Sequence, residues 1–92
     1  MTLEDRARRA MLAANLWNDS IMKEARAHIE ATLLDKFKAT PLSDAEQLRW
    51  VRMLMEAHET YAKYFQRVLN DGALARAELE RRKTLSERVL RR

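Results

Sequence analysis

Apolar residues recur at intervals of three or four along most of the chain, and this period is typical of amphipathic α-helices. The intervals predict a first helix over residues 3–17, whose apolar stripe is mostly alanine and therefore permits close approach of another helix. They predict a second helix over residues 20–39. Thr2 is the expected N-cap of the first helix, and the capping residues 18–20 predict a break before the second. We therefore expect an all-α fold.

The third predicted helix, residues 44–69, has the most regular pattern, because its apolar positions are spaced 3-4-3-4-3-4 in the manner of a heptad stripe. Pro41 ends the second helix. Ser43 and Glu46 then predict a capping box at the start of the third. Because this turn is short, we expect an antiparallel helical hairpin, with the N-terminal helix packed on it.

A second apolar stripe runs beside the first on the third helix. Together the two stripes cover about 160° of the helix, which is wider than one partner helix covers. Either the N-terminal helix covers the second stripe in an ordinary three-helix core, or the stripe is a self-association face. The chain has 92 residues and no cysteine, so its small core has no disulfide support, and this favours a homo-oligomer, a dimer or larger. The predicted self-association residues are Trp50, Leu54, Tyr61, Tyr64 and Val68.

Gly72 is the only glycine and follows Asn70 and Asp71, a pattern that predicts the end of the third helix in a left-handed cap. Charge changes at the same place. Residues 1–72 carry 11 Lys/Arg and 11 Asp/Glu, whereas residues 73–92 carry seven against three, so the whole net charge of +4 lies beyond Gly72. We expect a helical body over 1–72 and a basic C-terminal helix or tail over 73–92. The predicted partner-docking residues are Arg76, Arg81, Arg82, Lys83, Arg88, Arg91 and Arg92.

The chain contains no catalytic signature. His28 and His58 are the only histidines, and the sequence after His58 lacks the second histidine of a zinc-protease helix. Neither a glycine-rich phosphate loop nor a nucleophile with a placed base is present. We expect no enzyme activity, no metal and no cofactor. The N-terminus lacks a secretory signal, and no apolar run approaches the roughly 20 residues that span a bilayer, so we expect a soluble, cytoplasmic protein with no membrane partner.

Three segments carry a resemblance to a known group of proteins. They read LWNDSIMKEA (16–25), KFKATPLSDAEQLRWV (36–51) and VLNDGALARAELERRKTL (68–85). With this layout the chain resembles small all-helical accessory proteins encoded by tailed bacteriophages and prophages. The resemblance implies location in a bacterial host cell or on the virion, and for some such proteins a place among head-assembly or packaging genes.

Three functional hypotheses follow. The leading one is a non-enzymatic phage-type accessory protein that self-associates through its second apolar stripe and docks on a larger protein complex through residues 73–92. The second is a nucleic-acid-associated packaging or regulatory factor, in which the same cations neutralise phosphates. The third is a small inhibitor of a host protein or defence system.

Overall fold

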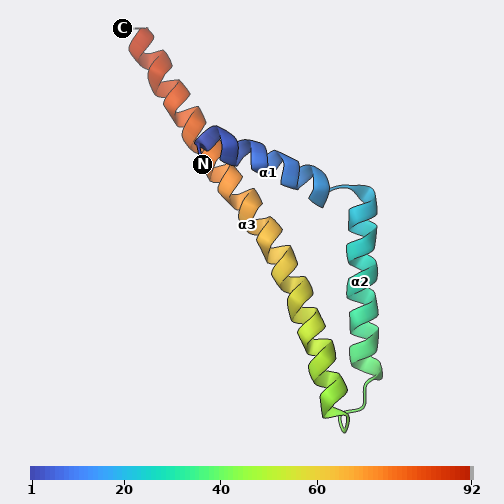
Figure 1. Ribbon diagram of the computed structural model, residues 1–92. Helices are drawn as coiled ribbons and strands as arrows, with labels where there is room; N and C mark the ends of the chain where they lie inside the picture. The colour runs from blue at the N-terminus through green and yellow to red at the C-terminus, as the bar shows by residue number, and fades with distance from the viewer. Residues whose placement is uncertain (92) are drawn as a thin grey trace. The chain divides into compact units, whose positions relative to one another are not determined.

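The computed structural model describes residues 1–91, which form three helices, α1 (Leu3–Trp17), α2 (Ser20–Ala39) and α3 (Ala45–Leu90) (Figure 1). The all-α fold is therefore confirmed. The helices contribute to two compact units. Unit 1 consists of Met1–Leu16 and Phe65–Arg92, and unit 2 consists of Trp17–Tyr64.

Side chains cap the first two helices where the sequence predicts. Thr2 Oγ1 accepts a hydrogen bond of 3.0 Å from the Asp5 amide, and an Asp5 carboxylate oxygen accepts one of 3.4 Å from the Thr2 amide. Hydrogen bonding of the Asp5 carboxylate by the side chain and the backbone of Thr2 holds the pKa of Asp5 below its usual value. The Asp19 carboxylate accepts bonds of 3.0 Å from the amides of Ile21 and Met22, so it caps α2. Both caps satisfy amides that lack a partner in the first turn of a helix.

The cap of α3 lies one residue later than expected. Asp44 Oδ1 accepts a bond of 3.1 Å from the Gln47 amide, and α3 begins at the next residue after Asp44. The capping box predicted for Ser43 and Glu46 is therefore wrong. Asp44 is as good an N-cap residue as a serine, and its carboxylate also suits the positive end of the helix dipole.

The helix end predicted at Gly72 is also wrong. α3 continues through this position to Leu90, and no glycine in residues 1–91 has a positive φ. Gly72 instead lies where α1 meets α3 within unit 1. A Cβ atom added at Gly72 would stand 1.9 Å from the Ala10 Cβ and 3.3 Å from the Arg6 carbonyl oxygen. The glycine therefore permits close approach of two helices, although glycine inside a helix costs about 1 kcal/mol relative to alanine.

Unit 1 is held by this close contact together with an ion pair. Its buried apolar side chains among the described residues are Ala10, Val68 and Ala75. Beside them, Arg6 Nε donates bonds of 3.1 Å to both carboxylate oxygens of Asp71, and Arg6 Nη2 donates one of 2.6 Å. Such a two-pronged pair fixes geometry as well as charge. The Arg6 hydrogen bonds hold the pKa of Asp71 below its usual 3.8.

The Arg6–Asp71 pair makes the stability of unit 1 dependent on pH. Because the pKa of Asp71 is lower in the folded chain than 3.8, the pair stabilises unit 1 above that pH. This stabilisation disappears as the pH falls through the lowered pKa. We expect Asp71→Asn to lower the melting temperature at pH 7 and to converge with the unchanged chain as the pH is brought below 3.8. Thermal melts across this range test it, with Asp35→Asn on exposed α2 surface as the control; a gap that stays constant down to pH 2.5 would contradict the linkage.

Unit 2 is the predicted antiparallel hairpin of α2 and the first part of α3 (Figure 1). Thr40 closes the end of α2, where its backbone amide donates to the Lys36 carbonyl at 3.1 Å and its hydroxyl donates to the same oxygen at 2.6 Å. Val51 is the one buried side chain among the residues of this unit. Much of the apolar surface of the hairpin is therefore left exposed.

Candidate functional site

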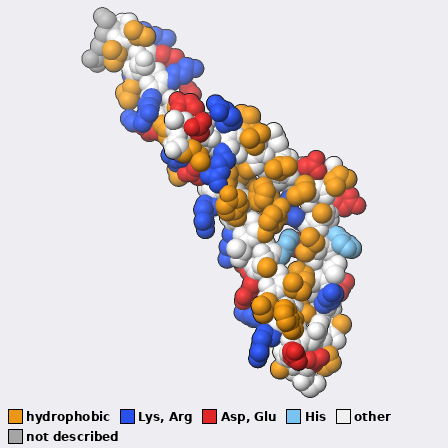
Figure 2. Space-filling view, viewed as in Figure 1, with side chains coloured by type: hydrophobic (Ala, Val, Ile, Leu, Met, Phe, Trp, Pro, Cys, Tyr) orange, Lys and Arg blue, Asp and Glu red, His pale blue; other side chains and the backbone are white. Residues whose placement is uncertain are grey.

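The second apolar stripe of the sequence forms an exposed surface on α3 in unit 2. We call this surface the aromatic face, and it consists of Trp50, Met53, Leu54, Tyr61 and Tyr64. These side chains are between 40 and 57 % exposed. They recur at helical intervals of three, four and seven residues, so they lie along one side of α3. Apolar side chains gather visibly on the surface of the hairpin in Figure 2. Large aromatic side chains carry most of the energy in many protein interfaces.

Val68 does not belong to the exposed surface. It is 6 % exposed and lies in unit 1, where it contributes to the buried apolar set. The helical period places Val68 on the same stripe as Trp50. The period does not indicate which residues of a stripe are buried by another part of the chain. The aromatic face therefore ends at Tyr64.

One end of the hairpin carries a cluster of aromatic and charged side chains. The Arg26 guanidinium lies 3.6 Å from the centroid of the Trp17 ring and also donates a hydrogen bond to the Trp17 carbonyl oxygen. The Trp17 ring lies 6.5 Å from the ring of Tyr61. His58 Nε2 lies 3.2 Å from Glu30 Oε1. The contact between His58 and Glu30 joins the two helices of the hairpin, whereas Trp17, the last residue of α1, contacts Arg26 of α2 and the ring of Tyr61 on α3.

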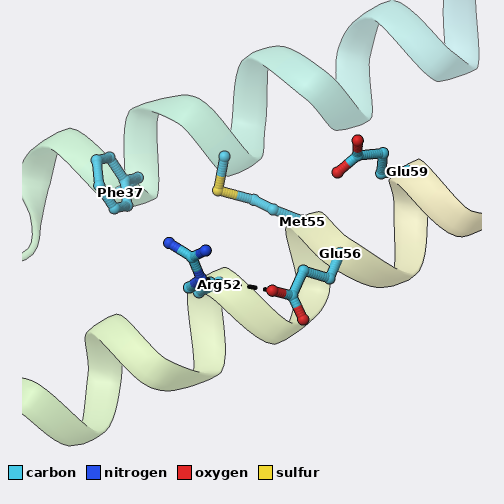
Figure 3. Close-up of a pocket in the computed structure, with 5 residues that line it drawn as sticks. All are labelled: Phe37, Arg52, Met55, Glu56 and Glu59. Atoms are coloured by element: carbon cyan, nitrogen blue, oxygen red, sulfur yellow. Dashed lines mark ion pairs between the residues drawn. The ribbon is translucent and has the colours of Figure 1, made fainter.

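A shallow hollow of about 270 Å³ lies between the helices of the hairpin (Figure 3). Phe37 of α2 and Met55 of α3 give it an apolar floor, and Arg52, Glu56 and Glu59 of α3 surround that floor. Arg52 pairs with Glu56 at 3.4 Å, and Lys63 pairs with Glu59 at 3.2 Å. Because each carboxylate already has a cation, the hollow offers no concentrated charge to a small ligand.

The two histidines do not form a metal site with their neighbours. His58 is engaged with Glu30, and His28 lines a separate open hollow of about 400 Å³ with Ile21, Glu24 and Ala25. In residues 1–91 no group of three or more histidine, cysteine, aspartate or glutamate side chains is placed to hold a metal ion.

The predicted docking cations lie along the distal part of α3, in unit 1. The Glu78 carboxylate accepts bonds of 2.9 and 2.7 Å from Arg81 and one of 3.2 Å from Arg82. These bonds, with that of Arg81 the strongest, lower the pKa of Glu78 to about 2. Lys and Arg side chains are prominent along this part of α3 in Figure 2. Four further cations have no ion pair within residues 1–91, namely Arg76, Lys83, Arg88 and Arg91. Arg92 lies outside the described residues.

Sequence reasoning missed two of the contacts that hold these surfaces in place. Arg26 and Trp17 are nine positions apart and belong to different helices, so no helical period relates them. Arg6 and Asp71 are 65 positions apart. For the Arg6–Asp71 pair, the sequence offers one indication. Asp71 directly precedes a glycine, and a neighbouring helix can come close to a glycine within a helix.

Comparison with known proteins adds no relative: no protein-family model, no curated protein and no solved structure matches this chain. Within residues 1–91, none of the helices is both long enough and apolar enough to cross a membrane. The site is therefore defined by its own geometry, which comprises an exposed aromatic face on unit 2 and a basic helical segment in unit 1.

Proposed function

We propose that this chain is a non-enzymatic assembly protein of the phage accessory type, which self-associates through the aromatic face of unit 2. The supporting observation is that five large apolar side chains stay exposed on a hairpin whose one buried residue is Val51. Exposed apolar side chains gathered on one side of a helix are typical of protein interaction sites. A second copy of the chain would bury it and would also supply the core that the hairpin lacks.

The basic segment of α3 supports the second half of this proposal, docking on a larger complex. Arg76, Lys83, Arg88 and Arg91 are cations without ion pairs within the described chain, so a negatively charged partner gains their full attraction. Both an acidic protein surface and a nucleic acid have that chemistry. The assembly role therefore separates into one apolar surface for copies of the chain and one basic surface for a different molecule.

The mass of the purified chain in solution tests self-association. Light scattering on a sizing column should give at least twice the chain mass of 10.9 kDa. Trp50→Ala and Leu54→Ala should shift this mass toward 10.9 kDa, because truncating a central interface side chain costs about 2 kcal/mol, or roughly thirtyfold in the dissociation constant. These two residues are preferable to Tyr61, whose ring also contacts Trp17 inside the hairpin.

Leu42→Ala is the control, because Leu42 is also apolar and, at 91 %, more exposed than Trp50 or Leu54, but lies in the turn before α3. It should leave the mass unchanged, and circular dichroism should show equal helix content in all variants. A monomeric mass for the unchanged chain would refute self-association and would favour the inhibitor hypothesis.

A further inference from the structure

The last turns of α3 carry apolar side chains that no other part of the described chain covers. Every residue from 81 to 90 is exposed. Leu85 and Val89 stand one helical turn apart, and they are 46 and 71 % exposed. Together the two side chains form a short apolar strip along one side of the helix.

Arginines border this apolar pair on both sides. Arg81 and Arg88 are seven positions apart, so they lie on one flank of Leu85, whereas Arg82 lies on the other flank, one turn before Leu85. We call these five residues the distal face. Arg88 has no ion pair within residues 1–91, and both Arg81 and Arg82 bond to Glu78.

We propose that the distal face binds an acidic amphipathic helix of a partner protein. This inference deepens the proposed docking role and rests on it. The partner's apolar side chains would cover Leu85 and Val89, and its glutamates or aspartates on both sides of that stripe would pair with the flanking arginines. Helix recognition of this kind uses a few apolar anchors at helical spacing, and paired charges set the orientation. Arginine also suits the task because its planar group can engage a carboxylate with two hydrogen bonds.

Charge argues against a second copy of the same segment as the occupant. Residues 81–91 contain five cations (Arg81, Arg82, Lys83, Arg88 and Arg91) and one anion (Glu87), a net charge of +4. Two such segments side by side would place like charges in contact, which is destabilising. The basic segment and the aromatic face therefore serve different partners.

The apolar pair argues against a nucleic acid. Phosphate contacts need cations, and the arginines would supply them whatever stood at positions 85 and 89. A nucleic acid bound through its phosphates would leave Leu85 and Val89 in water. An acidic helix uses both the arginines and the apolar pair.

Glu78 occupies two of the arginines in the free chain. Its carboxylate accepts bonds from Arg81 and Arg82, so it holds the position that a partner's carboxylate would take. Removing its charge should release both arginines for the partner. Glu78→Gln is therefore expected to strengthen binding, which a purely structural role for Glu78 would not produce.

A defined probe tests the proposal on the full chain. The probe is a fluorescent synthetic helix of about 20 residues, long enough to be helical, with leucines every three or four positions and glutamates on both sides of them. Fluorescence anisotropy at low salt should show saturable binding. The double variant Leu85→Ser/Val89→Ser and the single variant Arg88→Glu should each weaken it at least tenfold, and Glu78→Gln should tighten it severalfold. The controls Leu42→Ser and Lys23→Glu make comparable changes of polarity and of charge on exposed surface elsewhere and should leave binding unchanged.

Three results would overturn the proposal. The first is no binding of the probe, and the second is equal binding of a probe that has glutamine in place of every glutamate. The third is binding of a short DNA duplex that the Leu85→Ser/Val89→Ser variant leaves intact while the peptide does not bind, which would assign the segment to nucleic acid. Light scattering on the same samples keeps self-association separate. If the chain is monomeric and binds the probe, only self-association is refuted. If the chain is oligomeric and does not bind the probe, only the acidic-helix partner is refuted.

Discussion

Gly72→Leu is expected to release α1 from α3 while leaving α3 helical. Even the first carbon of the new side chain would overlap the Ala10 Cβ, at 1.9 Å, and would press on the Arg6 carbonyl oxygen and the Ala10 Cα. Two of these three atoms are backbone, so no rotation of a side chain relieves the contact. Overpacking costs about 1–3 kcal/mol where the surroundings can yield. Here the whole of α1 must move, and the Arg6–Asp71 hydrogen bonds are lost with it.

The measurement is hydrogen exchange of the α1 amides together with circular dichroism. Leucine forms helix better than glycine by about 0.8 kcal/mol, so the helix content of α3 should hold or rise while α1 loses protection. Ala73→Leu adds the same side chain one position later, at an exposed residue. It should leave both the protection of α1 and the helix content of α3 unchanged. Loss of α1 protection in both variants would show that added bulk near this point, rather than the contact with Ala10, is responsible.

A double substitution examines the same contact from the other side. In Ala10→Gly/Gly72→Ala the alanine and the glycine exchange places. Position 10 then has no Cβ atom to overlap the new one at position 72. The remaining neighbours of a Cβ at position 72 are 3.3 and 3.4 Å away, which a shift of a few tenths of an ångström accommodates. We expect this variant to protect α1 nearly as well as the unchanged chain, whereas Gly72→Ala alone does not.

Val51→Asp is expected to open the hairpin of unit 2. Val51 is 1 % exposed and is the one buried side chain described in that unit, so a carboxylate there is taken out of water without a partner. Uncompensated burial of a charge costs about 3–5 kcal/mol. A hairpin with so little core cannot absorb that loss. Helix content should fall sharply, and thermal unfolding should lose its cooperativity.

The matched control is Gln47→Asp, one turn earlier on α3. Gln47 is exposed and lies in the first turn, where an added negative charge suits the helix dipole. It should leave the melting curve unchanged or raise its midpoint slightly. If Val51→Asp were to melt like Gln47→Asp, the packing of α2 on α3 could not depend on Val51.

The elements that the sequence predicted well are those determined by local chemistry. The period of three and four places α1 and α2 at the predicted residues, and Thr2 caps α1 because its hydroxyl reaches an amide three residues away. The choice between Ser43 and Asp44 was harder, since both are good caps one position apart. The hairpin follows from the short turn at Pro41 and from two helices with apolar stripes.

Gly72 shows where local reasoning fails. Asparagine, aspartate and glycine in succession are typical of a helix end, but the decisive partner of Gly72 is Ala10, which is 62 positions away. The alanine stripe of the first helix is compatible with close approach by another helix. Nothing in the sequence indicates which residue would meet it. The same limit applies to Val68, whose stripe was read correctly but whose burial depends on unit 1.

The interaction surfaces divide in the same way. The period identified Trp50, Leu54, Tyr61 and Tyr64 as one side of a helix, and the structure leaves that side exposed. The basic residues were plain from the charge count alone. The pairing of Glu78 with Arg81 and Arg82 follows from helical spacings of three and four, which the predicted C-terminal helix already contains. The wrong stop at Gly72 therefore did not affect it, and the structure adds the exposed fractions of Leu85 and Val89.

The contact between Ala10 and Gly72 also limits which substitutions this sequence can accept without losing its fold. Most side chains here are exposed, and substitutions at such positions usually change the free energy of unfolding by no more than about 0.5 kcal/mol. Descendants of this chain can therefore diverge over most of their length and keep the three helices. Positions 10 and 72 are constrained jointly, since a methyl group fits at one of them only when the other carries hydrogen. The packing of α1 on α3 therefore requires that substitutions at these two positions occur together.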